Sequence, residues 1–251
     1  MRIVLKFGSG ILATTQGSTL DKKQFARLSR EVAALVAAGH ECIVVSSGAV
    51  AAGLAALGLK ARPEGLALRQ ACAAVGQSKL MQLYSECYAQ HGLGVAQLLL
   101  THGDIDSRTR CQNVRNTLEC LLAQKRVVPI INENDSVATE ELKFGDNDRL
   151  SAEVAMLVQA DLLILLTSVE GLLDARGNRI PEVRDMASVT GLAREDKGRL
   201  SVGGMVSKLQ AVGLAVEAGI PTVIASGRKA GRIAAVVAGR DAGTRFPVGR
   251  V

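Results

Sequence analysis

Residues 1–10 read MRIVLKFGSG, and this stretch decides the fold class. Its apolar run, residues 3–7, has the length of a buried strand, and the Gly-Ser-Gly turn at residues 8–10 ends it. The same unit, a short apolar run followed by a longer helical pattern, recurs along the chain. Repeated units of this kind predict right-handed crossovers and a parallel sheet covered by helices on both faces. We therefore expect an α/β protein, a three-layer αβα sandwich around a mostly parallel sheet.

The remaining elements follow from the same pattern. Further strands are expected at residues 42–45, 95–100, 127–131, 162–166 and 222–225, and a β-excursion at residues 136–142. Helices are expected at residues 20–38, 49–57, 66–88 (with a kink near Gly76), 108–123, 146–158, 203–218 and 232–237. No repeat, linker or low-complexity segment interrupts the pattern. We expect a single domain over residues 1–251, with a lobe boundary near residues 167–175 inside one continuous sheet.

The composition is that of a core-forming chain with few aromatic side chains. Hydrophobic residues make up 48% and charged residues 22%, whereas aromatic residues make up 2%. A core of Ala, Val, Leu and Ile is typical of helices packed on a buried parallel sheet. So few rings argue against a protein that stacks nucleic-acid bases. The net charge of +6 is spread along the chain without a basic run, so we expect small anionic ligands and no nucleic acid.

Cysteine usage and apolar segments indicate the compartment. The five Cys residues are an odd number, and none stands in CxxC or Cys/His spacing, so neither a disulfide framework nor a zinc site is expected. The first apolar run is too short for a signal peptide, and no apolar stretch reaches membrane-spanning length. We expect a cytoplasmic protein with no membrane partner.

The loops that follow the strands are the places to look for a ligand, because ligands of open parallel sheets bind outside the carboxyl ends of the strands. Residues 8–13, GSGILA, match the dinucleotide pattern GxGxxG/A, which is a weak signal alone. That motif needs a helix at once, but residues 14–18 are polar and poorly helical. It also needs an acidic residue after the second strand, where this chain has Ser46 and Ser47. We regard a nicotinamide cofactor as the weaker interpretation.

Phosphate binding of another kind fits these loops better. Gly8, Gly10 and Gly48 let backbone N–H groups approach an anion, and Lys6 stands just before the first turn. Lys208 lies near the start of a helix, whose dipole also favours negative charge. Neither a Walker motif nor a protein-kinase HRD motif occurs. Residues 146–148, Asp-Asn-Asp, could cap the helix that follows them. One cap needs only one of the three residues, so capping explains this polar segment only in part.

Several segments, in order, carry a resemblance to a known family. They are LKFGS at residues 5–9, SSGAVAAG at 46–53, AVGQS at 74–78, PIINEND at 129–135, GDND at 145–148 and GGM at 203–205. With these motifs the chain resembles the glutamate 5-kinases of the amino acid kinase superfamily along almost its whole length. The resemblance implies the amino acid kinase fold and ATP- and Mg²⁺-dependent phosphorylation of the side-chain carboxylate of L-glutamate. The products would be L-glutamyl 5-phosphate and ADP, in the first step of proline biosynthesis.

The implied chemistry agrees with the residues present. A carboxylate is ionised at neutral pH, so the nucleophile needs no general base, and none of His40, His91 and His102 lies in a matching motif. The resemblance assigns Lys6 and Lys208 to the transferring phosphoryl group and Asp148 to the orientation of both lysines. It assigns Ser47, Asp135 and Asn147 to glutamate, with Asn132 and Asp146 close by and Asp135 facing the α-ammonium group. The nucleotide-binding positions are Lys6, Gly8, Ser9, Thr167, Ser168, Val202, Gly203, Gly204, Met205, Val206, Ser207 and Lys208.

The chain departs from the family pattern in the nucleotide segments and in length. The family usually has Thr-Asp where this chain has Thr167 and Ser168, which puts nucleotide affinity in question. The glycine-rich segment before Gly203 is also altered, and we expect a short form without the C-terminal PUA domain that many members of the family carry. The resemblance further implies a lobe for the amino acid at about residues 1–167 and one for the nucleotide at about 168–251. It also implies a homodimer or tetramer and feedback inhibition by proline near residues 132–143.

Other functions stay open at this point. A related kinase acting on uridylate, carbamate, aspartate or acetylglutamate would be separated by a panel of acceptors, and residues 132–135 argue against it. A catalytically silent, ligand-sensing homologue would lack turnover, and the intact set of Lys6, Asp148 and Lys208 argues against that alternative. The nicotinamide interpretation would require direct binding of NAD(H).

Overall fold

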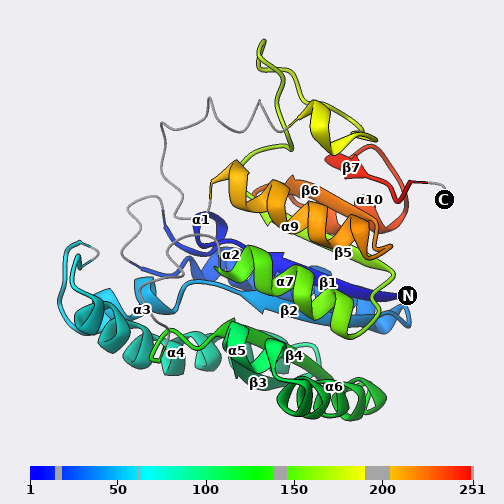
Figure 1. Cartoon of the computed structure of the whole chain (residues 1–251). Helices are drawn as coiled ribbons and strands as arrows, with labels where there is room; N and C mark the ends of the chain where they lie inside the picture. The colour runs from blue at the N-terminus through cyan, green and yellow to red at the C-terminus, as the bar shows by residue number, and fades with distance from the viewer. Residues whose placement is uncertain (15–18, 62, 138–145, 190–203, 250–251) are drawn as a thin grey trace.

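The computed structural model describes residues 1–14, 19–61, 63–137, 146–189 and 204–249, and their main feature is one seven-stranded sheet (Figure 1). The strands are β1 (Arg2–Phe7), β2 (Glu41–Ser46), β3 (Gly94–Leu100), β4 (Val127–Glu133), β5 (Leu162–Thr167), β6 (Thr222–Ser226) and β7 (Thr244–Phe246). Their order across the sheet is β3-β4-β2-β1-β5-β6-β7. All pairs are parallel except β6 and β7, so the predicted mostly parallel sheet is confirmed.

Helices cover both faces of the sheet, as the sequence predicts. They are α1 (Ser9–Leu12), α2 (Lys22–Ala37), α3 (Ala49–Ala56), α4 (Leu66–Ala89), α5 (His102–Asp106), α6 (Arg108–Ala123), α7 (Asp146–Leu157), α9 (Met205–Glu217) and α10 (Arg232–Val237), with a 3₁₀ turn η1 (Met186–Ser188). Figure 1 shows α7 and α9 side by side on one face, with α2 behind the sheet. No helix among the described residues is long and apolar enough to cross a membrane.

Strand β1 lies in the middle of the sheet and contributes to two cores. Ile3, Leu5 and Phe7 point into the core built with α2 and α4, whereas Val4 points into the core built with α6, α7 and α9. Side chains alternate between the faces of a strand, so Lys6 lies on the same face as Val4. The alternation therefore directs the Lys6 side chain towards α7 and α9.

Two glycines let α3 and α4 approach each other more closely than side chains would allow. A Cβ atom on Gly76 would lie 1.8 Å from the carbonyl oxygen of Ala49, and one on Gly53 would lie 1.9 Å from that of Cys72. Helix α4 runs unbroken through Gly76, so this glycine provides close packing. The contact fixes the neighbouring Gln77 beside the turn that follows β2.

Several short elements were not predicted from the sequence, namely α1, α5, η1 and β7, each of three to five residues. Elements this short carry too few apolar positions to give a periodic signal. The β-excursion expected at residues 136–142 falls mostly outside the described residues, which include only Ser136 and Val137 in a turn.

Candidate active site

An ionic cluster lies where β1 meets the first turns of α7 and α9. The Lys6 Nζ atom is 2.5 Å from one carboxylate oxygen of Asp148, and the Lys208 Nζ atom is 3.1 Å from the other. The Ser207 hydroxyl donates a hydrogen bond of 2.9 Å to that second oxygen. All three charged residues are buried, with relative exposures of 5%, 1% and 5% for Lys6, Asp148 and Lys208. One carboxylate thus holds two ammonium groups in fixed positions.

The pKa values of the cluster follow from burial and from this pairing. Burial alone would raise the pKa of the Asp148 carboxyl, but the charges of Lys6 and Lys208 outweigh burial and hold its pKa below the usual value of 3.8. Burial lowers the pKa of Lys208 below 10.5; the carboxylate of Asp148 opposes this shift and the charge of Lys6 adds to it. The cluster carries two positive charges against one negative charge, which suits a polyanionic ligand.

The turn after β1 leaves room beside the Lys6 ammonium group. A Cβ atom added to Gly8 would lie 3.6 Å from the Lys6 Nζ atom, and one added to Gly10 would lie 3.8 Å from the Ser168 hydroxyl. The turn is thus adjacent to both Lys6 and the residue after β5. Helix α1 begins at once at Ser9 but ends at Leu12. One turn of helix is too short to supply the dipole that the dinucleotide motif needs.

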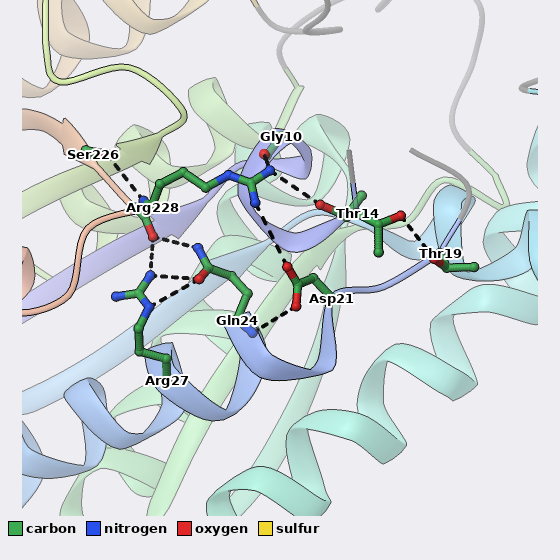
Figure 2. A network of polar contacts seen from close by, with 10 residues as sticks. Gly10, Thr14, Thr19, Asp21, Gln24, Arg27, Ser226 and Arg228 are labelled. Atoms are coloured by element: carbon green, nitrogen blue, oxygen red, sulfur yellow. Dashed lines mark hydrogen bonds and ion pairs between the residues drawn. The ribbon is translucent and has the colours of Figure 1, made fainter. Parts of the chain in front are cut away.

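A network of polar contacts ties this turn to the loop after β6, as Figure 2 shows. The Arg228 guanidinium group donates to the Gly10 carbonyl and lies 4.0 Å from the Asp21 carboxylate, which caps α2. The Gly227 carbonyl accepts from Gln24 and Arg27 of α2. The position of the turn is therefore set by α2 and the β6 loop together.

A chain of neutral amides lies beside the ionic cluster, beginning one residue earlier on α7. The Asn147 Oδ1 atom accepts from the backbone N–H of Glu133 at 3.1 Å. Its Nδ2 atom donates to Ser47 Oγ at 3.2 Å and to Asn132 Oδ1 at 3.0 Å. The Asn132 Nδ2 atom then donates to Gln77 Oε1 at 2.9 Å. Three predicted substrate-binding residues, Ser47, Asn132 and Asn147, are thus brought together.

The amide chain ends at a cavity of about 280 Å³. Asp135, Glu133, Gln77 and Ala49 are among its lining residues. Asp135 supplies a carboxylate at this cavity, as its predicted contact with an ammonium group requires. The amide chain thus connects the cavity to Asn147, the neighbour of Asp148 in the ionic cluster, at the carboxyl edge of the sheet.

The structure leaves other predicted site residues without a visible role. Ser9 and Val206 are exposed, and Met205 packs against the core under α9. Gly204 accepts from Ser207 through its carbonyl, and the Thr167 carbonyl accepts from Gly227. Val202, Gly203 and the side chain of Asp146 lie outside the described residues.

Sequence reasoning assigned no role to Gln77, although its motif was part of the resemblance. The signal that could have found it is a polar residue inside an apolar helical stripe. Gln77 stands on the buried face of α4 with Ala73, Leu80 and Tyr84. A glutamine on such a face needs hydrogen-bond partners, which points to a polar site under the helix.

Comparisons with known proteins identify relatives of this chain. The model of the Amino acid kinase family matches residues 1–226. The chain is 45% identical to the "Glutamate 5-kinase" of Myxococcus xanthus over 98% of its own length and 66% of the relative's. The "Glutamate 5-kinase" of Chromohalobacter salexigens is 47% identical over 97% of this chain and 65% of its own length. That of Thermus thermophilus is 45% identical over 98% of this chain and 67% of its own length. The chain thus spans about two thirds of its relatives' length.

A solved structure with a similar fold is that of UMP kinase from Bacillus anthracis. It superposes with a TM-score of 0.64 at 13% identity, covering 99% of this chain and 96% of that one. At this identity the similarity concerns the fold alone, and it confirms the predicted architecture.

Proposed function

Because the chain belongs to the amino acid kinase family, we propose that it transfers the γ-phosphoryl group of ATP to the side-chain carboxylate of L-glutamate. The products are L-glutamyl 5-phosphate and ADP, and the reaction is the first step of proline biosynthesis. One observation carries the proposal: the ion pairs of Lys6 and Lys208 with Asp148 lie directly beside the amide chain and the cavity of Asp135. A phosphoryl site and an amino-acid site are therefore adjacent.

The chemistry needs electrostatic stabilisation more than proton transfer. In the proposed reaction an oxygen of the acceptor carboxylate forms a bond to the γ-phosphorus while the bond to the β,γ-bridging oxygen breaks, and ADP leaves with that electron pair. Lys6 and Lys208 offset the repulsion between the anionic nucleophile and the phosphates. Asp148 holds both ammonium groups in place before the substrates meet, so little reorganisation is needed.

The residues near the cluster fit a nucleotide with its own cation. Among the described residues, no group of three His, Cys, Asp or Glu side chains could hold a metal ion. Mg²⁺ commonly binds to one or two carboxylates and to substrate phosphates. Mg²⁺ bound with ATP would neutralise part of the phosphate charge, and Lys6 and Lys208 would contact the phosphate oxygens. Gly8 lies beside the Lys6 ammonium group and Ser168 lies beside Gly10 of the same turn, where those oxygens would be received.

Acceptor-dependent release of ADP tests the proposed function. The purified protein with MgATP should release ADP when L-glutamate is added, and hydroxylamine should trap the acyl phosphate as a hydroxamate. Aspartate, N-acetylglutamate, carbamate and UMP serve as competing acceptors. ADP release with one of these and not with glutamate would overturn the substrate assignment, while ATP binding with no turnover of any acceptor would overturn the enzymatic role.

Three further features of the proposed enzyme rest on the resemblance. They are inhibition by proline at the amino-acid site, assembly into dimers or tetramers, and the division into an amino-acid lobe at about 1–167 and a nucleotide lobe at about 168–251. Glutamate kinetics with and without proline, together with light scattering, test the first two.

A further inference from the structure

The hydrogen bonds of the amide chain beside the ionic cluster all run in one direction, from Asn147 through Asn132 to Gln77. A backbone N–H is always a donor, so the Asn147 atom that accepts from the Glu133 N–H is the oxygen. The Asn147 nitrogen must then donate to Asn132, which must use its oxygen to accept. The Asn132 nitrogen in turn donates to the oxygen of Gln77. Each amide orientation is thus fixed by the one before it.

The chain ends in a donor, the Nε2 group of Gln77, a residue that lines the cavity. Since the Gln77 oxygen accepts from Asn132, its Nε2 group faces the other way and presents two hydrogens. The Gln77 side chain is buried, with 8% exposure, and its Nε2 atom has no partner among the described residues. A buried donor without an acceptor is unfavourable, so this atom calls for an acceptor from the cavity.

We propose that Gln77 is a substrate-binding residue that selects an α-amino acid by donating from its Nε2 atom to the α-carboxylate of the acceptor. The inference rests on the proposed function and adds the group that recognises the non-reacting end of the substrate. Gln77 and Asp135 line the same cavity, one offering donors and the other a negative charge. A carboxylate and an ammonium group on one carbon atom match this pair, whereas the two lysines serve the reacting carboxylate and the phosphates.

The direction of the chain also explains why an amide is needed at this position. A glutamate in place of Gln77 could still accept from Asn132, but it would present a second oxygen to the cavity instead of a donor. Gln77→Glu therefore keeps the hydrogen bonds of the amide chain and replaces only its last donor, the Nε2 group, by an acceptor. This makes the substitution a specific test of the donor, with little change in volume.

The experiment compares wild type, Gln77→Glu and the control Gln90→Glu, which adds the same charge at the exposed end of α4. We expect the KM for glutamate to rise about 100-fold in Gln77→Glu, since a charge-assisted hydrogen bond becomes a repulsion. The kcat and the KM for ATP should stay within about threefold of wild type. The control should leave all three unchanged. Thermal melting checks that each variant is folded.

A second ligand separates binding of the α-carboxylate from a general effect on the site. The compound 4-aminobutyrate keeps the amino group and the side-chain carboxylate of glutamate but lacks the α-carboxylate. Its inhibition constant against glutamate should be the same in wild type and Gln77→Glu. The inference is overturned if the KM for glutamate does not change, if both ligands weaken by the same factor, or if only kcat falls. A wild type that phosphorylates no glutamate would instead overturn the proposed function.

Discussion

Asn147 and Asp148 are neighbours on α7, yet they belong to two regions of opposite character. Asp148 is part of an ionic cluster of buried charges, while Asn147 is part of a chain in which every member is neutral. Both regions consist of buried or half-buried polar groups held by short contacts. In the proposed function this difference divides the work: the charges would stabilise the phosphates at one end, and the oriented amides would recognise the amino acid at the other. Changes in the first region should affect kcat, and changes in the second should affect the KM for glutamate.

The largest effect is expected when a charge is removed from the ionic cluster. Lys208→Ala should lower kcat by about 10²- to 10³-fold, the range seen when one group that stabilises the transition state is lost. The KM for glutamate should change little, because the amide chain is intact. Coupled detection of ADP under saturating substrates measures this effect.

A suitable control for Lys208→Ala is Lys229→Ala. Lys229 is an exposed cation after β6 and pairs with Glu170 at 3.1 Å. It carries the same charge outside the ionic cluster, so its loss should leave kcat unchanged. An equal loss of kcat in both variants would mean that kcat depends on the net charge and not on the position of the lysine. The proposed difference between the two regions would then be wrong.

Removing the central carboxylate should affect folding as well as catalysis. Asp148→Asn leaves two buried ammonium groups without their counter-charge, and a broken buried pair costs about 3 kcal/mol of unfolding free energy. The pKa of Lys208 should fall further, because Asp148 opposes the lowering caused by burial. Urea unfolding and a kcat–pH profile measure the two effects. A variant as stable as wild type would show that the cluster is not a coupled unit.

The contrast between the two regions also explains what the sequence could reveal. Lys6 and Lys208 could be singled out because each stands beside a glycine turn at the end of a predicted strand or the start of a predicted helix, whereas the role of Asp148 came from the resemblance. The parallel sheet could be predicted because its buried strands are continuous apolar runs. The hydrogen bond between Gln77 and Asn132 could not be predicted, since residues 55 positions apart meet only through the packing of α4 on the sheet. The antiparallel β7 has three residues, too few for a pattern.

A smaller effect is expected when a charge is introduced into the amide chain. Asn147→Asp keeps the acceptor for Glu133 but removes the donor to Ser47 and Asn132, so the chain loses its direction. We expect the KM for glutamate to rise about tenfold, because about one hydrogen bond that orients the amides is lost. The kcat should change less. Initial rates over a range of glutamate concentrations measure it.

Asn116→Asp on α6 provides the matched control for that substitution. Asn116 is exposed and uses its Oδ1 atom to accept from Gln112 at 2.8 Å, a role that aspartate can keep. Its kinetic constants should equal those of wild type. If Asn147→Asp lowered kcat and left the KM unchanged, Asn147 would belong functionally with the ionic cluster.

The smallest effect is expected for a pair outside both regions, His102 with Glu153, and it concerns the unfolding free energy. The His102 Nδ1 atom lies 2.9 Å from the Glu153 carboxylate, and both side chains are largely buried. The hydrogen bond that His102 donates to the Glu153 carboxylate raises the pKa of His102 above 6.5, against the effect of burial; Glu133 adds to the rise and Arg149 opposes it. Burial raises the pKa of Glu153, but its bonds to His102 and Arg149 outweigh burial and lower it below 4.5.

The pH window of this pair follows from the two signs. A raised pKa of His102 gives stabilisation that is complete below about pH 6.5 and is lost as the pH rises through the folded-state value. A lowered pKa of Glu153 gives stabilisation that is present above about pH 4.5 and is lost as the pH falls through its folded-state value. His102→Gln should therefore reduce the unfolding free energy by about 1 kcal/mol more at pH 5.5 than at pH 8.5.

Urea unfolding at those two pH values, with the exposed His91→Gln as control, measures the contribution of the pair. The change in unfolding free energy that the control substitution causes should be the same at the two pH values. Glu153→Gln should remove the same pH dependence as His102→Gln, and the double variant should add nothing to either. Additive effects would mean that the two side chains do not act as a pair.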